Sequence, residues 1–446
     1  MNRTIAAVLL VLGLSLSGAA GVTVTGADRA VTLSELAGTE TLVTVVLKDS
    51  GAKDPNLKVI SVTDTTMTVL TQKNDLIPYL LDTVQEVQVQ GGRVEGSRFK
   101  PDEVQILRAE QQRVVERAVS RVREIFAEAN DDQELKIDAA VLLALGNDNS
   151  AMGYLKQLAE SNDIMTQLEA SRALYLVGES ISESLLKQGL ESGNRQARAL
   201  AAILCGLTGQ KDTVPYLNPM FNDRAVELSA PAARALARLG EREIIPRLLT
   251  MIEEPNETKG DAAVFALSQL GGEDIRTEML AKAGQTEGKI RYRVARVLHS
   301  LDDPSKITEL KAIFNNYPTL TPDVALLLSR ESDWDATQFL RARLARREDP
   351  TEANLLYRAE NAAALLAGGD PSAMAVFQDL LRADNAAAKM RVFELVIELG
   401  SVRVIPILQP SIENVDRKLS LGASQAAIAL AVPAYRTRLL EVRKER

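Results

Sequence analysis

The sequence is poor in the residue types that most often carry chemistry. It holds one cysteine, Cys205, and one histidine, His299, among 446 residues. A single cysteine excludes a disulfide within the chain and any zinc site built from several cysteines. Phosphate-binding loops, dinucleotide fingerprints, nucleophile elbows and paired-histidine metal motifs are also missing. We therefore expect no metal, no cofactor and no catalytic residues, and we predict that the protein is not an enzyme.

The chain also lacks a net positive charge, and it has few aromatic residues. The formal net charge is -8, so the chain lacks the basic surface that attracts nucleic acid or anionic membranes. Aromatic residues make up 4% of the chain, whereas the hydrophobic share of 46% is ordinary for a folded protein. Alanine and leucine supply much of that share, which favours closely approaching helices over an all-β core. No nucleic-acid partner is expected.

Long hydrophobic runs are absent, and the run that opens the chain is short. Arg3 precedes an apolar stretch over residues 5–16, and small residues follow at positions 17–20. This order is typical of a secretory signal peptide, and about a dozen residues are too few to span a bilayer. We predict that residues 1–20 are removed and that the mature protein is periplasmic or secreted, with no membrane insertion after cleavage. An uncleaved anchor is the alternative.

Residues 22–95 have the composition of a small β domain. Four runs rich in threonine and valine alternate as strands do, at residues 42–48, 58–62, 66–72 and 84–89. Residues 49–56 predict a polar turn, and residues 75–82 predict a further short strand and turn. A short helix capped by Thr32 is expected ahead of them. One helix and about five strands in so short a segment indicate a strongly bent barrel.

The stretches "LVTVVLKDS", "KVISVTDTTMTVLTQ" and "IPYLLDTVQEVQV" occur in an order that resembles the Sm-like fold. An SH3-like barrel is the competing interpretation. Sm-like proteins hold RNA through an aspartate and an asparagine near one strand and an arginine-glycine pair in the last hairpin. Asp64 and Met67 occupy comparable places, but Thr68 replaces the asparagine and no arginine-glycine pair follows. The resemblance therefore implies self-association through exposed strand edges, and a cap on the helices that follow is the alternative.

Residues 101–446 form a repeat array. Residues 101–130 predict a charge-rich amphipathic helix. Beyond it, glycines close successive segments at Gly146, Gly178, Gly209, Gly240, Gly271, Gly368 and Gly400, and the interval is 31 residues from Gly178 through Gly271. A small-residue column and a leucine column keep this interval, at Ala170, Ala201, Ala232, Ala263 and Val294 and at Leu174, Cys205, Leu236, Leu267 and Leu298. Each row therefore predicts a helix that ends in a left-handed glycine cap.

The other half of each repeat is helical too, because Pro215, Pro246 and Pro406 stand where a first helical turn accepts proline. A two-helix hairpin has two apolar faces, so neighbours must stack, and we expect an elongated array of about ten hairpins. The register weakens over residues 302–349, where Asp302 replaces the capping glycine.

The segments "LEASRALYLVG", "APAARALARLG", "DAAVFALSQLGG" and "YRVARVLHSLDD" resemble the HEAT-repeat superfamily, particularly the short bacterial type also found in phycobilin lyases. The expected fold class is mainly α, an α-α superhelix of the HEAT/armadillo type preceded by a small Sm-like or SH3-like β-barrel.

One further column suggests where a partner binds. Two residues before the leucine column, arginines alternate with apolar residues, at Arg172, Ile203, Arg234, Phe265 and Arg296. The resemblance implies that these second helices line the concave side, where arginine pairs well with carboxylates. We predict that Arg172, Arg234, Phe265 and Arg296 bind an acidic partner. Salt bridges to acidic residues of adjacent repeats are the alternative. Cys205 and His299 are interpreted as packing residues.

Together these features predict an exported, non-catalytic scaffold that binds another protein through the concave face of a helical solenoid. A HEAT-type accessory enzyme or chaperone, similar to a lyase, is the alternative. An oligomeric nucleic-acid binder built on the β domain is a weaker one, which the acidic composition disfavours.

The signal peptide gives the first testable prediction. The mature protein should begin near Gly21 and should lie outside the cytoplasm, because signal peptidase cleaves after a small-residue motif such as the one that ends at Ala20. N-terminal sequencing of native protein from fractionated cells measures this directly. Soluble cytosolic protein that retains Met1 would contradict the prediction.

Overall fold

The structure is a computed structural model of the whole chain. It describes residues 22–25, 33–36, 41–48, 51–62, 66–71, 76–90, 107, 109–346 and 349–445. The predicted signal peptide, Thr32 and Asp64 lie outside these residues. The chain divides into two compact units, Met1–Ile106 and Leu107–Arg446.

The N-terminal unit contains a six-stranded sheet with the strand order β1-β6-β2-β3-β4-β5. The strands are β1 (Thr23–Thr25), β2 (Leu42–Leu47), β3 (Lys53–Val62), β4 (Thr66–Leu70), β5 (Leu76–Leu80) and β6 (Val84–Val89). Neighbouring strands are antiparallel except β1 and β6, which pair in parallel. The short helix α2 (Leu33–Leu36) buries Leu33 and Leu36 among alternate valines of the strands. The small sheet and its short helix are therefore as predicted, but strand β1, which precedes the helix and pairs with β6, was not.

Strand β3 is longer than the sequence suggested, because it begins at Lys53 inside the predicted turn. A bulge explains the difference, since the β2–β3 register shifts between Val43 and Val45. Asn56 lies in the bulge with a φ of 61°, and Pro55 precedes it. A bulge accepts a proline that regular pairing excludes. The described pairings leave β1 and β5 as edges, so barrel closure stays a prediction.

The second unit is a solenoid whose described helices pair into ten hairpins, followed by one last helix. The first helices of the hairpins are α3 (Ala109–Glu128), α5 (Asn149–Ala159), α7 (Glu183–Glu191), α9 (Val214–Phe221), α11 (Ile245–Met251), α13 (Glu273–Ala283), α15 (Lys306–Asn316), α17 (Trp334–Ala345), α19 (Met374–Arg382) and α21 (Ile405–Ile412). The second helices are α4 (Gln133–Ala144), α6 (Ile164–Val177), α8 (Arg195–Thr208), α10 (Val226–Arg238), α12 (Glu257–Leu270), α14 (Gly288–Ser300), α16 (Thr321–Arg330), α18 (Glu352–Ala367), α20 (Ala386–Leu399) and α22 (Arg417–Ala431). The last helix is α23 (Pro433–Arg443). The predicted mainly helical fold is confirmed.

The repeat columns have the predicted structural roles. The small-residue column is fully buried, and Cys205 in the leucine column is buried as well. Burial raises the pKa of the Cys205 thiol to about 11, so the thiolate is scarce at neutral pH and the side chain acts as a core residue. Pro215, Pro246 and Pro406 lie in the first turns of α9, α11 and α21.

The helix caps follow the predicted pattern with informative shifts. Five of the predicted glycines have positive φ at helix ends, namely Gly178, Gly209, Gly240, Gly271 and Gly400. At Gly146 and Gly368 the next residue takes that conformation instead, Asn147 with a φ of 62° and Gly369 with a φ of 90°. Asp302, which replaces a glycine, adopts a φ of 53° itself. Asparagine and aspartate tolerate this region better than other residues with side chains, so the turn survives without glycine. The long helix predicted over residues 101–130 begins at Ala109, since Leu107 is not helical.

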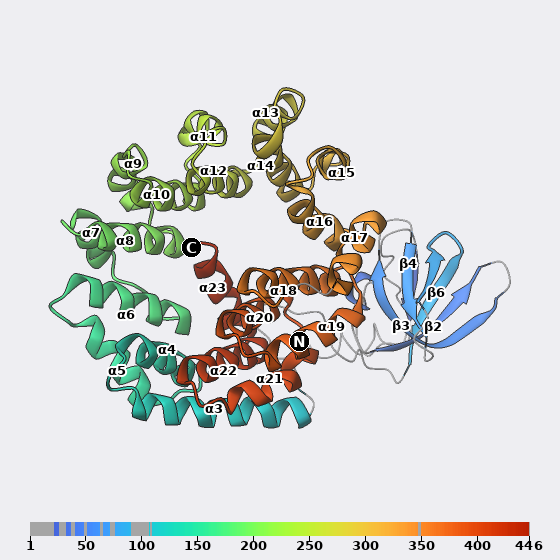
Figure 1. Cartoon of the computed structure of the whole chain (residues 1–446), viewed down its shortest axis with the longest axis horizontal. Coiled ribbons are helices and arrows are strands. Elements are labelled where there is room, and N and C mark those ends of the chain that lie inside the picture. The colour runs from blue at the N-terminus through green and yellow to red at the C-terminus, as the bar shows by residue number, and fades with distance from the viewer. Residues whose placement is uncertain are drawn as a thin grey trace, which may run out of the picture. The chain divides into compact units, whose positions relative to one another are not determined.

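The solenoid does not remain an open array, which corrects the expected elongated shape. Helix α3 packs along α21 and α22, so the first hairpin contacts the last one (Figure 1). Val114, Ala118 and Val122 of α3 belong to the same buried apolar cluster as Ile412 and Leu421. The unit is therefore a closed ring, with the even-numbered helices from α4 to α22 as its inner layer and the odd-numbered helices from α3 to α21 outside (Figure 1).

Polar contacts support the closure at the outer edge of this seam. Arg117 Nη2 lies 2.7 Å from Glu413 Oε2, and Arg417 Nη2 lies 3.0 Å from Asp131 Oδ2. Inside the seam, the Gln111 side chain donates a hydrogen bond of 2.9 Å to the Val402 carbonyl. The pKa of the Asp131 carboxyl and that of the Glu413 carboxyl are both lowered, chiefly by hydrogen bonds from Arg417 and Arg117. These pairs therefore keep their charges at neutral pH.

Closure of the ring can be tested with a carbodiimide, which joins a carboxylate to an amine only when the two are in contact. Lys418 Nζ lies 3.4 Å from Asp132 Oδ2 across the seam, and the lysine is well exposed. We expect a cross-linked peptide joining residues 132 and 418 in the monomeric fraction, identified by mass spectrometry.

Matched controls are available in the same chain. Lys418→Arg keeps the charge and should abolish this cross-link. The contact of Lys282 with Glu253, between α13 and the turn that follows α11 in the preceding repeat, should cross-link whether the array is open or closed. A sample that yields the second cross-link and not the first has an open solenoid.

Candidate functional site

The four residues predicted to bind a partner all lie on inner helices. Arg172 is in α6, Arg234 in α10, Phe265 in α12 and Arg296 in α14. Along the inner layer of the ring, α10, α12 and α14 follow one another, and α8 lies between α6 and α10 (Figure 1). The sequence thus placed them on the correct layer, but the structure gives each a different environment.

Phe265 is the centre of a cluster of cationic side chains. The guanidinium carbon of Arg234 lies 6.0 Å from the ring centroid of Phe265, and that of Arg238 lies 5.2 Å from it. A guanidinium over an aromatic face is attracted by the ring quadrupole. Phe265 therefore orients two arginines of the neighbouring helix, one of which the sequence pattern did not single out.

Both arginines hold the end of the chain itself. Arg234 is 7% exposed and donates a hydrogen bond to the backbone carbonyl of Glu445. Arg238 Nε lies 2.8 Å from Glu445 Oε1, and the side chain of Glu445 is 2% exposed. Desolvation lowers the pKa of the Arg234 guanidinium, with Glu445 acting in the opposite direction. Arg234 is therefore occupied from within and not open to an outside partner in this structure.

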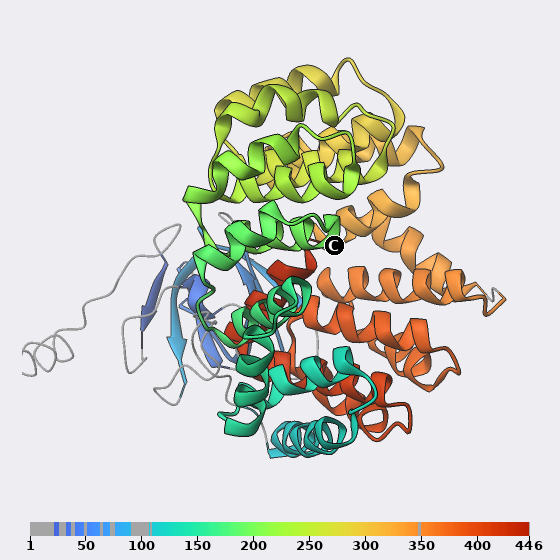
Figure 2. The same cartoon turned by 90° about the vertical axis from the view of Figure 1, so that its left-hand side faces the viewer.

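Helix α23 reaches this cluster by crossing the interior of the ring, and the chain end lies beside α8 (Figures 1 and 2). It packs against α6, α8, α20 and α22. Tyr435 is fully buried, and its hydroxyl accepts a hydrogen bond of 2.9 Å from the Gln425 side chain. The C-terminal helix is thus a packed element of the core.

Two arginines of α23 bind the ends of inner helices. Arg438 Nε donates to the Leu176 carbonyl at 2.9 Å, and Arg436 Nη2 donates to the Glu398 carbonyl at 2.9 Å. These carbonyls belong to the last turns of α6 and α20, where the helix dipole favours a cation. The approach at α20 needs a glycine, because a Cβ on Gly400 would lie 2.3 Å from Arg436 Nη2.

A tyrosine of α6 also contacts the last turn of α23. Tyr175 of α6 donates a hydrogen bond of 2.9 Å from its hydroxyl to Glu441 Oε2. Burial, together with Glu441, raises the pKa of the Tyr175 hydroxyl to about 12. The last turn of the chain therefore presents two carboxylates, Glu441 and Glu445, to groups of the inner layer.

Arg296 belongs to a second, more exposed part of the inner face. Its Nη1 lies 2.5 Å from Asp261 Oδ1, and the two side chains are 35% and 47% exposed. This is a salt bridge between adjacent repeats, the alternative that the sequence left open. Arg296 also lies over the Tyr292 ring at 5.8 Å, and burial raises the pKa of Tyr292 to about 12.

The same kind of contact continues along the next helices. The Tyr357 hydroxyl of α18 donates to Asp323 Oδ1 of α16 at 3.5 Å, and Arg343 lies 4.6 Å above the Tyr357 ring. Arg391 of α20 then pairs with Glu360 of α18 at 2.6 Å. We use the name inner ladder for these residues of the inner helices α12 to α20, which are Asp261, Tyr292, Arg296, Asp323, Tyr357, Glu360 and Arg391. Arg343 of the outer helix α17 packs over the Tyr357 ring.

Of the four side chains, Arg172 has the fewest polar contacts. Its side chain is half-buried, and it forms no hydrogen bond or ion pair with any residue in the described ranges. His299, in contrast, lies 3.0 Å from Glu331 Oε1 and links α14 to the end of α16. Its position fits the packing role expected from the sequence.

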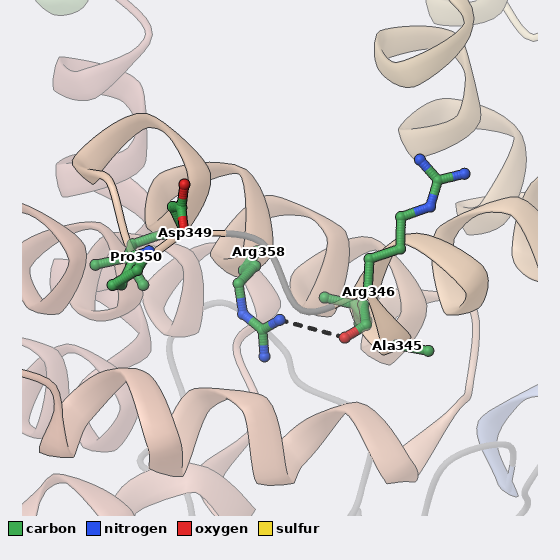
Figure 3. A pocket seen from close by; sticks show the side chains of 7 residues that line it. Ala345, Arg346, Asp349, Pro350 and Arg358 are labelled. Carbon is green, nitrogen blue, oxygen red and sulfur yellow. Dashed lines mark hydrogen bonds between the residues drawn. The ribbon is translucent and has the colours of Figure 1, made fainter.

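Two concave features of the described surface lie beside helix ends. One lies between the end of α17 and the start of α18, where Arg358 donates to the Leu344 carbonyl at 3.2 Å while Arg346 points away (Figure 3). Another is lined by Gly272, Arg276 and Asp303 among others. Among the described residues, no three histidine, cysteine or acidic side chains are grouped to hold a metal. None of the described helices has the length and apolar character needed to cross a membrane.

Comparison with known proteins agrees with this architecture. The family model described as "HEAT repeats" matches residues 182–259, the segment from α7 into α12. The match covers three of the hairpins in whole or in part, and the other hairpins of the helical unit have the same two-helix form, which is consistent with a solenoid of HEAT-like repeats. No curated protein matches the chain.

Among solved structures, human deoxyhypusine hydroxylase in complex with glycerol is 17% identical and has a TM-score of 0.25, over 64% of this chain and 96% of that one. A TM-score so low supports no conclusion about activity.

Proposed function

We propose that this protein is an exported, non-catalytic scaffold that binds a protein partner through the inner face of its HEAT-repeat ring. The observation that carries the proposal is the inner ladder, a row of charged and aromatic side chains on the successive inner helices α12, α14, α16, α18 and α20. Aromatic residues and arginine are the types that contribute most to protein interfaces. The opening residues of the sequence support export.

The partner that fits this face carries charges of both signs. Arg296 and Arg391 of the ladder already pair with acidic neighbours, so a partner must either replace Asp261 and Glu360 or bind beside them. Arg172, which the described structure leaves without a salt bridge, is the most direct contact for a carboxylate. No observation specifically favours a lyase-like enzyme or a nucleic-acid binder, and neither is proposed.

We also propose that copies associate through the β unit. Strand β5 is an edge of the described sheet, and it exposes Ile77 and Leu80, which are 38% and 56% accessible. An exposed edge with apolar side chains is a template for pairing with another strand. The occupant we propose is the same edge of a second copy.

Reversal of charge on the inner face tests the scaffold proposal. The double variant Arg172→Glu/Arg296→Glu should weaken capture of the native partner at least tenfold, since a lost interfacial charge pair costs about 2 kcal/mol or more. The melting temperature should change little, because the exposed pair of Arg296 with Asp261 is worth about 0 to 1 kcal/mol.

The matched control is Arg123→Glu/Arg382→Glu, which makes the same change in charge on the outer helices α3 and α19. Capture from the native envelope is followed by quantitative mass spectrometry. If both double variants capture the partner equally well, the inner face is not the binding surface.

Self-association through β5 has its own test. Leu80→Glu should shift the full chain from oligomer to monomer in multi-angle light scattering, because it places a charge on the pairing edge. Val415→Glu replaces an exposed apolar residue of the helical unit, which is 95% accessible, and should leave the mass unchanged. A wild-type chain that is monomeric at all concentrations contradicts this proposal.

A further inference from the structure

The last turn of the chain resembles a bound ligand in the way it is held. Glu441 and Glu445 are four residues apart, which is one helical turn. Glu441 contacts α6, and Glu445 contacts α10. Glu441 accepts from the Tyr175 hydroxyl, and Glu445 accepts from Arg238 through its side chain. We use the name carboxylate site for the four residues that surround this turn, which are Tyr175, Arg234, Arg238 and Phe265.

The fit of this internal occupant is incomplete. Glu445 Oε2 and Arg234 Nε are both buried, and neither has a hydrogen-bond partner among the described residues. A buried polar atom without a partner loses its hydration and receives nothing in return. Burial also raises the pKa of the Glu445 carboxyl even with two arginines beside it. The site therefore has donor capacity that the chain's own end does not use.

The beginning of α23 is held differently. Tyr435 is fully buried, and Arg436 and Arg438 bind backbone carbonyls of α20 and α6. Removal of this part would expose a large aromatic side chain and leave helix ends uncapped. Beyond Arg443 the helix is over, and the exposed Lys444 precedes Glu445. Any release is thus confined to the last turn, while the rest of α23 stays in place.

We propose that the carboxylate site is a peptide-binding site that the chain's own last turn blocks until a partner helix with two acidic residues one turn apart displaces it. This inference rests on the proposed scaffold function and names the chemistry of the partner. Two carboxylates at that spacing match the tyrosine on one side and the arginines on the other. Once it no longer donates to the single Glu445 carbonyl, the planar guanidinium of Arg234 can donate two hydrogen bonds to one carboxylate.

The experiment uses a fluorescent peptide with the sequence of residues 433–445 of this chain, titrated into full-length protein and followed by anisotropy. The wild-type chain should bind it weakly, because its own end competes. Glu445→Lys places a cation against Arg234 and Arg238, and should release the last turn and raise the affinity for the peptide at least tenfold. A peptide with glutamine at positions 441 and 445 should lose this gain.

A charge swap supplies the matched control. Adding Arg238→Glu to Glu445→Lys restores an ion pair of reversed polarity, so the site should close again and the acidic peptide should no longer bind. Equal binding of the peptide to the wild type and to Glu445→Lys overturns the proposal, and so does failure of a folded Glu445→Lys chain to bind it.

A second measurement needs no substitution, in case Glu445→Lys does not fold. Carboxypeptidase digestion of the chain expressed to Arg446, followed by intact mass, should stop before Glu445, and an excess of the peptide with an amidated C-terminus should make it proceed past Glu441. Digestion that the peptide leaves unchanged overturns the proposal. Because neither measurement requires a native partner, failure here is distinguishable from failure of the inner-ladder proposal, which Arg172 and Arg296 test.

Discussion

The structure depends on one constraint, which is that every two-helix hairpin has two apolar faces and must cover both. Inside an array each hairpin is covered by its neighbours, but the two terminal hairpins of an open solenoid keep one face uncovered. Here the terminal faces cover each other, because α3 packs on α21 and α22. The apolar seam of Val114, Ala118 and Val122 thus replaces the polar caps that open repeat arrays require.

Closure has a second consequence, which is an enclosed inner layer. The C-terminal carbonyls of the inner helices α6 and α20 meet Arg438 and Arg436, two arginines of a single helix. Each contact compensates a helix end that would otherwise lack partners. The glycines after these helices adopt the left-handed turn, and they also leave room for the arginine side chains to reach the carbonyls. The close approach of Arg436 to Gly400 shows this second role. Backbone geometry and long-range packing are therefore coupled at the same residues.

The sequence predicted the local structure well, because local structure depends on spacing along the chain. The alanine and leucine columns revealed which side of each helix is buried, and the proline and glycine positions marked most of its ends. The departures have local causes as well: Asn147 replaces Gly146 as the left-handed residue, and a bulge at Asn56 lengthens a strand past Pro55.

The repeat spacing of a sequence does not tell which distant helix will cover the apolar face of a given helix. The seam between α3 and α22 and the destination of α23 join residues that are hundreds of positions apart, and no repeat spacing encodes them. Arg234 illustrates the limit. Its column placed it on the inner layer, but its burial comes from Glu445, 211 residues away. Arg238 was missed because it lies outside the repeated column, although it follows Arg234 by one helical turn.

The position of α23 also sets an order of events for each new molecule. Helix α23 is synthesised after α6 and α8, the early inner helices that it contacts. Until α23 emerges, α6 and α8 lack these neighbours. Contacts of such long sequence separation form slowly. A chain that crosses a membrane during synthesis would therefore acquire these contacts only after α23 itself has crossed.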